Sequence, residues 1–162
     1  MDSPADDNYD TIFRDCVLLR SLSISGHNLL EGFSAAAKVN PTALPYLSHL
    51  KIGIPYTPLD TTAHQALFDF VASKTMLRCF DYSDGCYSEV AKLAPLLSTL
   101  RSLPALETLG LDVMLENVEA FGTFVDGLPR HISALRLSFL YTASVQQRSC
   151  SPLLGLVGTL RA

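Results

Sequence analysis

The chain has 162 residues, of which 48% are hydrophobic and 17% charged, a composition typical of a folded globular domain. Its net charge of -4 and its 12 scattered lysines and arginines argue against a nucleic-acid partner. No apolar run reaches the roughly 18 residues of a membrane helix, and the N-terminus lacks the features of a signal peptide. We therefore expect no membrane partner and a cytoplasmic or nuclear location.

The N-terminal stretch MDSPADDNYD is acidic and polar, so residues 1–10 are predicted to be a solvated tail before a domain at 11–162. In that domain the apolar pattern LxxLxL occurs five times. The first positions are Leu19, Leu47, Leu77, Leu106 and Ile132, at steps of 28, 30, 29 and 26 residues. Three apolar positions often match by chance, but regular spacing indicates a repeat. Each copy is predicted to be a strand whose first, fourth and sixth residues face the core.

The segments between the copies carry apolar residues at helical spacing and are predicted to be helices, over residues 60–73, 88–102 and 116–128. In the last segment Val118, Phe121 and Val125 are expected to face the core. Pro95 is expected to disturb the middle helix, since proline lacks the N–H that a helix interior uses. Prolines just before three of the strands end the preceding helices.

A unit of one short strand and one helix buries its apolar face only by stacking on similar units. The sequence therefore predicts an α/β leucine-rich repeat solenoid of about five to six repeats, with short parallel strands on the concave side and helices on the convex side. The final stretch, LLGLVGTLRA, is interpreted as the start of a sixth repeat. We expect an incomplete C-terminal end whose uncapped last strand permits self-association.

The long, irregular repeats and the Leu-Pro junctions before three strands resemble the leucine-rich repeat region of fungal F-box/leucine-rich-repeat-like proteins. The resemblance covers roughly residues 10–162. It implies a ubiquitin-ligase platform that recognises substrates, in which a separate F-box binds the adaptor of a cullin ligase. The residues before Leu19 are too few for an F-box and lack its early Leu-Pro element. Contact with the cullin-ligase adaptor is therefore expected only if an F-box lies outside this chain.

The sequence contains no nucleophile elbow, phosphate loop or HExxH motif, and its four histidines fall at different positions of the repeat. The four cysteines form no CxxC pair, so we expect no metal site, no cofactor and no enzyme activity. Among the four cysteines, only Cys79 has a candidate chemical role. It is expected on the concave face beside Asp81, where Lys51 on the next strand could lower its pKa, but an ordinary thiol is the preferred interpretation.

The third, fifth and seventh residues of each copy should point away from the core, because side chains alternate along a strand. Nine of them are the predicted partner-binding residues: His49, Lys51, Cys79, Asp81, Ser83, Thr108, Asp112, Arg136 and Ser138. Lys51 and Asp81 are expected to pair across adjacent strands. A second possible surface is the set of strand-to-helix loops with Tyr56, Tyr87 and Tyr141. The predicted function is a non-enzymatic protein-protein interaction module with an unknown partner; the alternative is a truncated structural remnant of a larger repeat protein.

Overall fold

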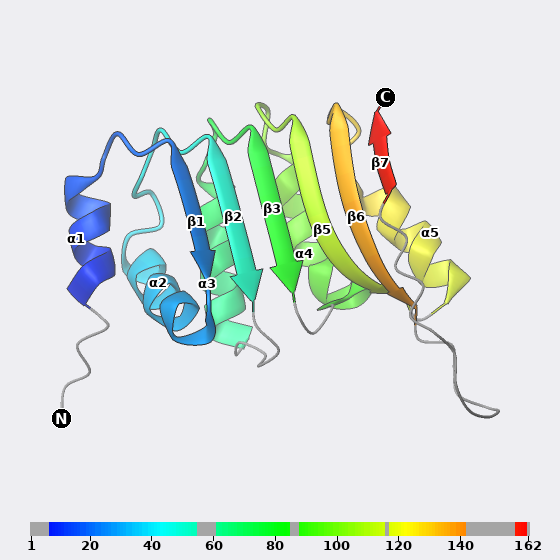
Figure 1. Cartoon of the computed structure of the whole chain (residues 1–162), viewed down its shortest axis with the longest axis horizontal. Helices are drawn as coiled ribbons and strands as arrows, with labels where there is room; N and C mark the ends of the chain where they lie inside the picture. Colours follow the sequence, from blue (N-terminus) through cyan, green and yellow to red (C-terminus); the bar gives the residue numbers. More distant parts are fainter. Residues whose placement is uncertain (1–6, 55–60, 85–87, 116, 142–157, 162) are drawn as a thin grey trace.

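The computed structural model describes residues 7–54, 61–84, 88–115, 117–141 and 158–161. Helices and strands alternate along them, except that β4 follows β3 and β7 follows β6 in the order of described elements (Figure 1). The helices are α1 (Asp7–Asp15), α2 (His27–Val39), α3 (Thr61–Ala72), α4 (Val90–Arg101) and α5 (Val118–Gly127). The strands are β1 (Ser21–Ser25), β2 (His49–Ile54), β3 (Cys79–Asp84), β4 (Ser88–Glu89), β5 (Thr108–Leu115), β6 (Ala134–Tyr141) and β7 (Gly158–Arg161). None of these described helices is long and apolar enough to cross a membrane.

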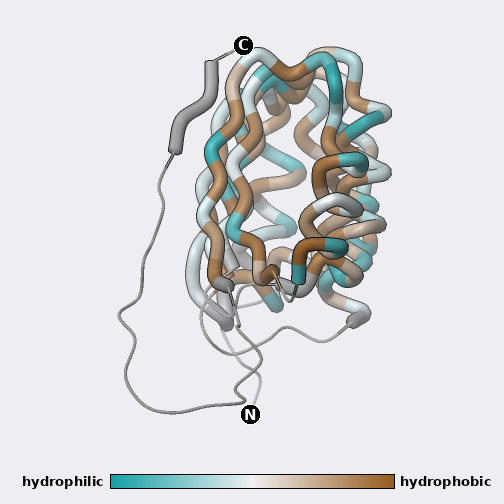
Figure 2. Tube along the Cα trace, turned by 90° about the vertical axis from the view of Figure 1, so that its right-hand side faces the viewer, coloured by the Kyte–Doolittle hydropathy of each residue, from teal (hydrophilic) through white to brown (hydrophobic). Residues whose placement is uncertain are grey.

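The strands form one sheet in which β1, β2, β3, β5 and β6 lie parallel and in that order. The short strand β4 pairs with β5. Helices α2 to α5 form a second layer on one face of the sheet, so the strands and helices separate into two layers (Figures 1 and 2). The α/β class and the parallel sheet are therefore confirmed for the described residues.

The final strand differs from the prediction of a sixth parallel repeat. β7 runs antiparallel to β6 and pairs with it from Ala134 to Leu137. A parallel neighbour requires a crossover connection, usually a helix. The sequence after β6 begins with a polar stretch, TASVQQRSCS, which lacks the apolar helical spacing of the earlier connections. The edge of β6 is thus paired with β7 over these four residues, but in the antiparallel direction.

The register of the sheet follows the five sequence copies. The third residues of the copies lie side by side in the order Ser21, His49, Cys79, Thr108 and Ala134. In each of the first four copies the carbonyl oxygen of the second residue accepts from two successive N–H groups of the next copy. Arg20, for example, accepts from Ser48 at 2.9 Å and from His49 at 2.9 Å. The predicted spacing therefore positions equivalent residues beside one another along the sheet.

The core lies between the sheet and the helices, where the first, fourth and sixth residues of the copies meet. In the three central copies these residues are at most 2% exposed: Leu47, Leu50, Ile52, Leu77, Phe80, Tyr82, Leu106, Leu109 and Leu111. In the last copy Ile132, Leu135 and Leu137 are only partly buried. Terminal copies bury less apolar surface because a stacked unit at an end has fewer neighbours.

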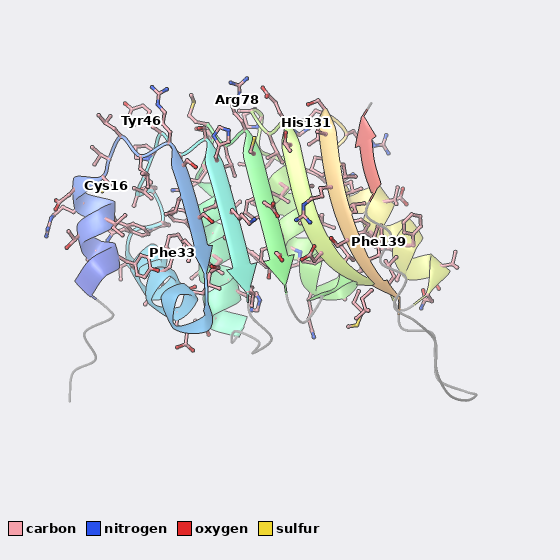
Figure 3. The ribbon with its side chains drawn as sticks, viewed as in Figure 1. Cys16, Phe33, Tyr46, Arg78, His131 and Phe139 are labelled. Carbon is pink, nitrogen blue, oxygen red and sulfur yellow. The ribbon has the colours of Figure 1, made fainter. Side chains whose placement is uncertain are left out.

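Helix α1 begins at Asp7, inside the segment expected to be a solvated tail. Its Tyr9 and Phe13 are buried and pack edge-to-face on Phe33 of α2, with ring centroids 5.6 and 5.4 Å apart. Phe13 also stacks on Phe70 of α3 at 5.6 Å. Figure 3 shows Phe33 on α2 beside this helix. Helix α1 therefore covers the N-terminal end of the core.

Helices α3, α4 and α5 confirm the three predicted helical segments, but two details differ. Pro95 lies exposed inside α4, and the helix continues through it to Arg101. In α5 the predicted core residues were wrong, because Val118, Phe121 and Val125 are 81%, 43% and 45% exposed. Phe124 is fully buried instead and packs on Phe139 of β6. No described helix follows α5, so part of its apolar surface has no neighbouring helix to cover it.

Candidate functional site

The face of the sheet opposite helices α2 to α5 is called the open face here, because no described helix covers it (Figures 1 and 2). A groove of about 390 Å³ crosses this face over β1, β2, β3, β5 and β6. Its polar lining comes from the third and fifth residues of the copies: Ser21, Ser23, His49, Lys51, Cys79, Asp81, Thr108 and Arg136. Six of the nine predicted binding residues therefore line one groove.

An ion pair between Asp81 and Arg136 spans the groove floor. Arg136 Nη2 donates to Asp81 Oδ1 at 2.5 Å, although β5 separates their strands. The residue between them in the register is Gly110. A Cβ atom at Gly110 would lie 2.9 Å from Asp81 Oδ1 and 3.1 Å from Arg136 Nε. The pair therefore crosses β5 where the strand has no side chain.

The expected pair between Lys51 and Asp81 was wrong, although the two residues are register neighbours. Asp81 is bound by Arg136, whose planar guanidinium offers several donors and reaches further than an ammonium. The same guanidinium also contacts Asp112 and Ser138, so more than one oxygen holds it in place. Lys51 stays exposed on the open face and forms no ion pair with any residue that the structure describes.

Beneath this ion pair lies Asp112, which is only 8% exposed. Ser83 Oγ donates to Asp112 Oδ2 at 2.6 Å, and Arg136 Nη1 lies 3.5 Å from Asp112 Oδ1, an ion pair without hydrogen-bond geometry. Arg136 Nη1 also donates to Ser138 Oγ at 3.3 Å. We call Asp81, Ser83, Asp112, Arg136 and Ser138 the arginine network. Its members Ser83, Asp112 and Ser138 support the groove without lining it.

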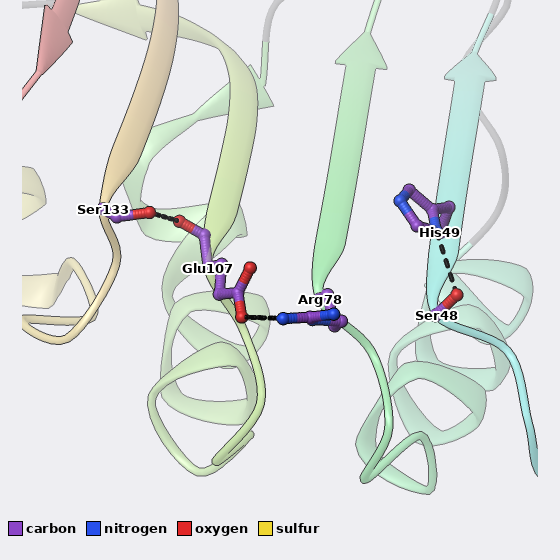
Figure 4. A network of polar contacts seen from close by, with 5 residues as sticks. All are labelled: Ser48, His49, Arg78, Glu107 and Ser133. Carbon is purple, nitrogen blue, oxygen red and sulfur yellow. Dashed lines mark hydrogen bonds and ion pairs between the residues drawn. The ribbon is translucent and has the colours of Figure 1, made fainter.

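A row of polar side chains borders the groove where the strands begin (Figure 4). Ser48 Oγ donates to the Arg20 carbonyl oxygen at 3.0 Å and lies 2.9 Å from His49 Nδ1. Arg78 Nε donates to Glu107 Oε1 at 3.1 Å. This hydrogen bond to the Glu107 carboxylate raises the pKa of Arg78 above its usual value. Both side chains are more than half exposed, so the pair adds little to stability.

In the described part of the chain, the side chains with metal-binding chemistry form no metal site. No three His, Cys, Asp or Glu side chains there are arranged to hold a metal ion. His64 lies on α3, and His131 lies before β6, with its Nε2 3.0 Å from the Leu103 carbonyl oxygen. Cys79 is a free, partly exposed thiol beside His49 in the register, and Cys16 is a free, exposed thiol.

The predicted loop surface cannot be compared with the structure. Tyr56 and Tyr87 lie outside the described residues, as does the side chain of Tyr141.

No family model matches the chain, and no curated protein matches it significantly. The open face is therefore interpreted from its own residues.

The predicted binding set omitted three groove residues at the third and fifth positions of the copies, namely Ser21, Ser23 and Gly110. Gly110 is the one that lies between the partners of the ion pair. Aligning the fifth residues of the copies places it between Asp81 and Arg136, which is the signal that was available in the sequence. A glycine alone suggests no binding role at that position. Its role becomes evident only when its two charged neighbours, Asp81 and Arg136, are considered together.

Proposed function

We propose that the chain is a non-enzymatic protein-interaction module that binds a partner on its open face, in the cytoplasm or the nucleus. One observation carries this proposal: the open face bears a groove lined by polar side chains from five successive strands. Side chains on rigid strands are held more precisely than side chains on loops, which lowers the entropy lost on binding. The arginine network restricts two of the charged groups further.

The resemblance to the repeat region of F-box/leucine-rich-repeat-like proteins supports the same proposal, since that region serves there as a substrate-recognition platform. The groove extends across five strands and is lined by both polar and apolar residues. This shape suits an extended polypeptide segment better than a small ligand, which takes a concave pocket that buries most of its surface. Contact with a cullin-ligase adaptor is proposed only for a longer protein in which an F-box accompanies this chain.

A peptide library with matched variants tests the proposal. Random dodecapeptides displayed on phage are selected on the native chain and then measured on Ser23→Arg and on Ala35→Arg. Ser23 lies in the groove, whereas Ala35 is an exposed residue of helix α2 on the other layer. Ser23→Arg should weaken the selected peptides by about tenfold or more, because the larger side chain fills the groove. Equal losses with both variants, or no selected peptide at all, would contradict an interaction surface on the open face.

A further inference from the structure

Of the charged side chains that line the groove, Asp81 and Arg136 bind each other, whereas Lys51 is accessible to a partner. It lies at the centre of β2, exposed, and lines the groove between Ser23 of β1 and Asp81 of β3. Neighbouring strands are about 4.8 Å apart, so its ammonium is within reach of both. Among the described residues, it makes neither an ion pair nor a side-chain hydrogen bond. Its charge is open to an external partner.

Lys51 makes no ion pair with Asp81 because Arg136 already binds that carboxylate. Arg136 binds Asp81 Oδ1 at 2.5 Å, and the Asp81 side chain is 32% exposed. The second carboxylate, Asp112, is buried beneath the same guanidinium and accepts from Ser83. Both carboxylates are therefore engaged and partly shielded, while the ammonium of Lys51 faces the groove. The accessible charge at the centre of the open face is positive, although the whole chain carries a net charge of -4.

We propose that Lys51 recognises the carboxylate of an aspartate or glutamate on an extended segment of a protein partner. This inference rests on the proposed interaction on the open face and specifies its chemistry. The hydroxyl groups of Ser21 and Ser23 are exposed on the adjoining strand and line the same groove, so they can donate to the same acidic side chain. A single cation among hydroxyl groups suits one carboxylate, whereas a nucleic-acid backbone requires several lysines and arginines.

The selected dodecapeptides provide the probe. Peptides that bind the native chain should contain Asp or Glu at one shared position, and Lys51→Met should weaken them by about tenfold, as for a close interfacial charge pair. Lys38→Met is the matched control, since Lys38 is exposed near the end of α2 and its loss changes the net charge equally. This control should bind like the native chain. Raising the salt from about 50 mM to about 500 mM should weaken native binding more than that of Lys51→Met.

Exchanging the charges of residue 51 and of the peptide distinguishes a loss of recognition from misfolding of the variant. Lys51→Glu should lose the acidic peptides and bind the same peptides when their shared acidic residue is replaced by lysine. Peptides that depend on Ser23 but lack an acidic residue and ignore Lys51→Met would overturn this inference while leaving the interaction surface intact. Failure to select any peptide that depends on Ser23 would overturn both.

Discussion

Asp81 on β3 and Arg136 on β6 form a 2.5 Å ion pair across an intervening strand, over the Cα atom of Gly110. The pair determines which charges of the open face are engaged and which remain accessible. A side chain at position 110 would meet both partners, so Asp81 or Arg136 would have to move. The chemistry of the groove therefore depends on a residue that has no side chain.

Substitution of Gly110 should uncouple the ion pair. In Gly110→Val the added atoms occupy the space between Asp81 Oδ1 and Arg136 Nε, which lie 2.9 and 3.1 Å from the Cβ position. A double-mutant cycle with Asp81→Asn and Arg136→Met should give a coupling free energy of about 1 kcal/mol in the native background. The same cycle in the Gly110→Val background should give a value near zero. An unchanged coupling energy would show that the arginine reaches Asp81 by another path.

Lys74 is fully buried and should make stability depend on pH. Its Nζ donates to the carbonyl oxygens of Pro41 at 2.9 Å and Ala43 at 2.5 Å and lies 3.7 Å from the centre of the Phe70 ring. Burial lowers the pKa of this ammonium from 10.5 to about 8. Between these two values the unfolded chain binds more protons than the folded one, so the free energy of unfolding should rise with pH relative to Lys74→Met.

Near neutral pH, Lys74→Met should be destabilised by about 1 to 3 kcal/mol, since both carbonyl groups lose a donor. Denaturant unfolding at a series of pH values measures both effects. Equal pH slopes for the native chain and the variant would contradict the shifted pKa of Lys74.

Helix α1 should be needed for stability, although it begins in a segment predicted to be a tail. Phe13 is 5% exposed and contacts two other phenylalanine rings. Phe13→Ala should therefore cost about 3 to 5 kcal/mol of unfolding free energy. Arg14→Ala on the exposed side of the same helix is the control and should leave stability nearly unchanged. A Phe13→Ala chain as stable as this control would mean that α1 does not cover the core.

Substitutions on the buried and exposed faces of α5 should also differ in how much unfolding free energy they cost. Phe124→Ala removes a fully buried ring and should cost about 3 to 5 kcal/mol, whereas Val118→Lys changes an exposed residue and should cost less than about 0.5 kcal/mol. Thermal or denaturant unfolding distinguishes the two. If self-association occurs through the exposed apolar residues, sedimentation should show it reduced in Val118→Lys. A large loss of stability in Val118→Lys would restore the sequence interpretation of this helix.

The sequence predicted the register of the strands well, because the spacing within LxxLxL is the same in every copy and equivalent residues therefore lie side by side. Ser21, His49 and Cys79 lie side by side as their copies require. It predicted the ends of the chain less well. At α5, one helical face was chosen by apolar spacing alone, but burial depends on which neighbours exist. Phe124 is buried against Phe139 of β6, whereas Phe121 contacts the same ring and remains 43% exposed.

The candidate site was predicted as a surface but not as a network. Strand alternation placed the nine residues on one side of the sheet, and geometry then divided them into groove residues and supporting residues. Lys51 and Asp81 are neighbours in the register, which made their pairing the simple expectation. The actual pair skips a strand, and the long side chain of Arg136 crosses β5 at Gly110, where no Cβ atom stands between the partners.

Amide NMR with the tightest selected dodecapeptide shows whether the open face binds a partner. We expect chemical-shift changes confined to groove residues, with Ser21, Ser23, Lys51 and Thr108 among the largest. The same titration of Lys51→Met should produce much smaller changes. Changes confined to the helices α2 to α5, with the strand amides unaffected, would mean that the open face is not the binding surface.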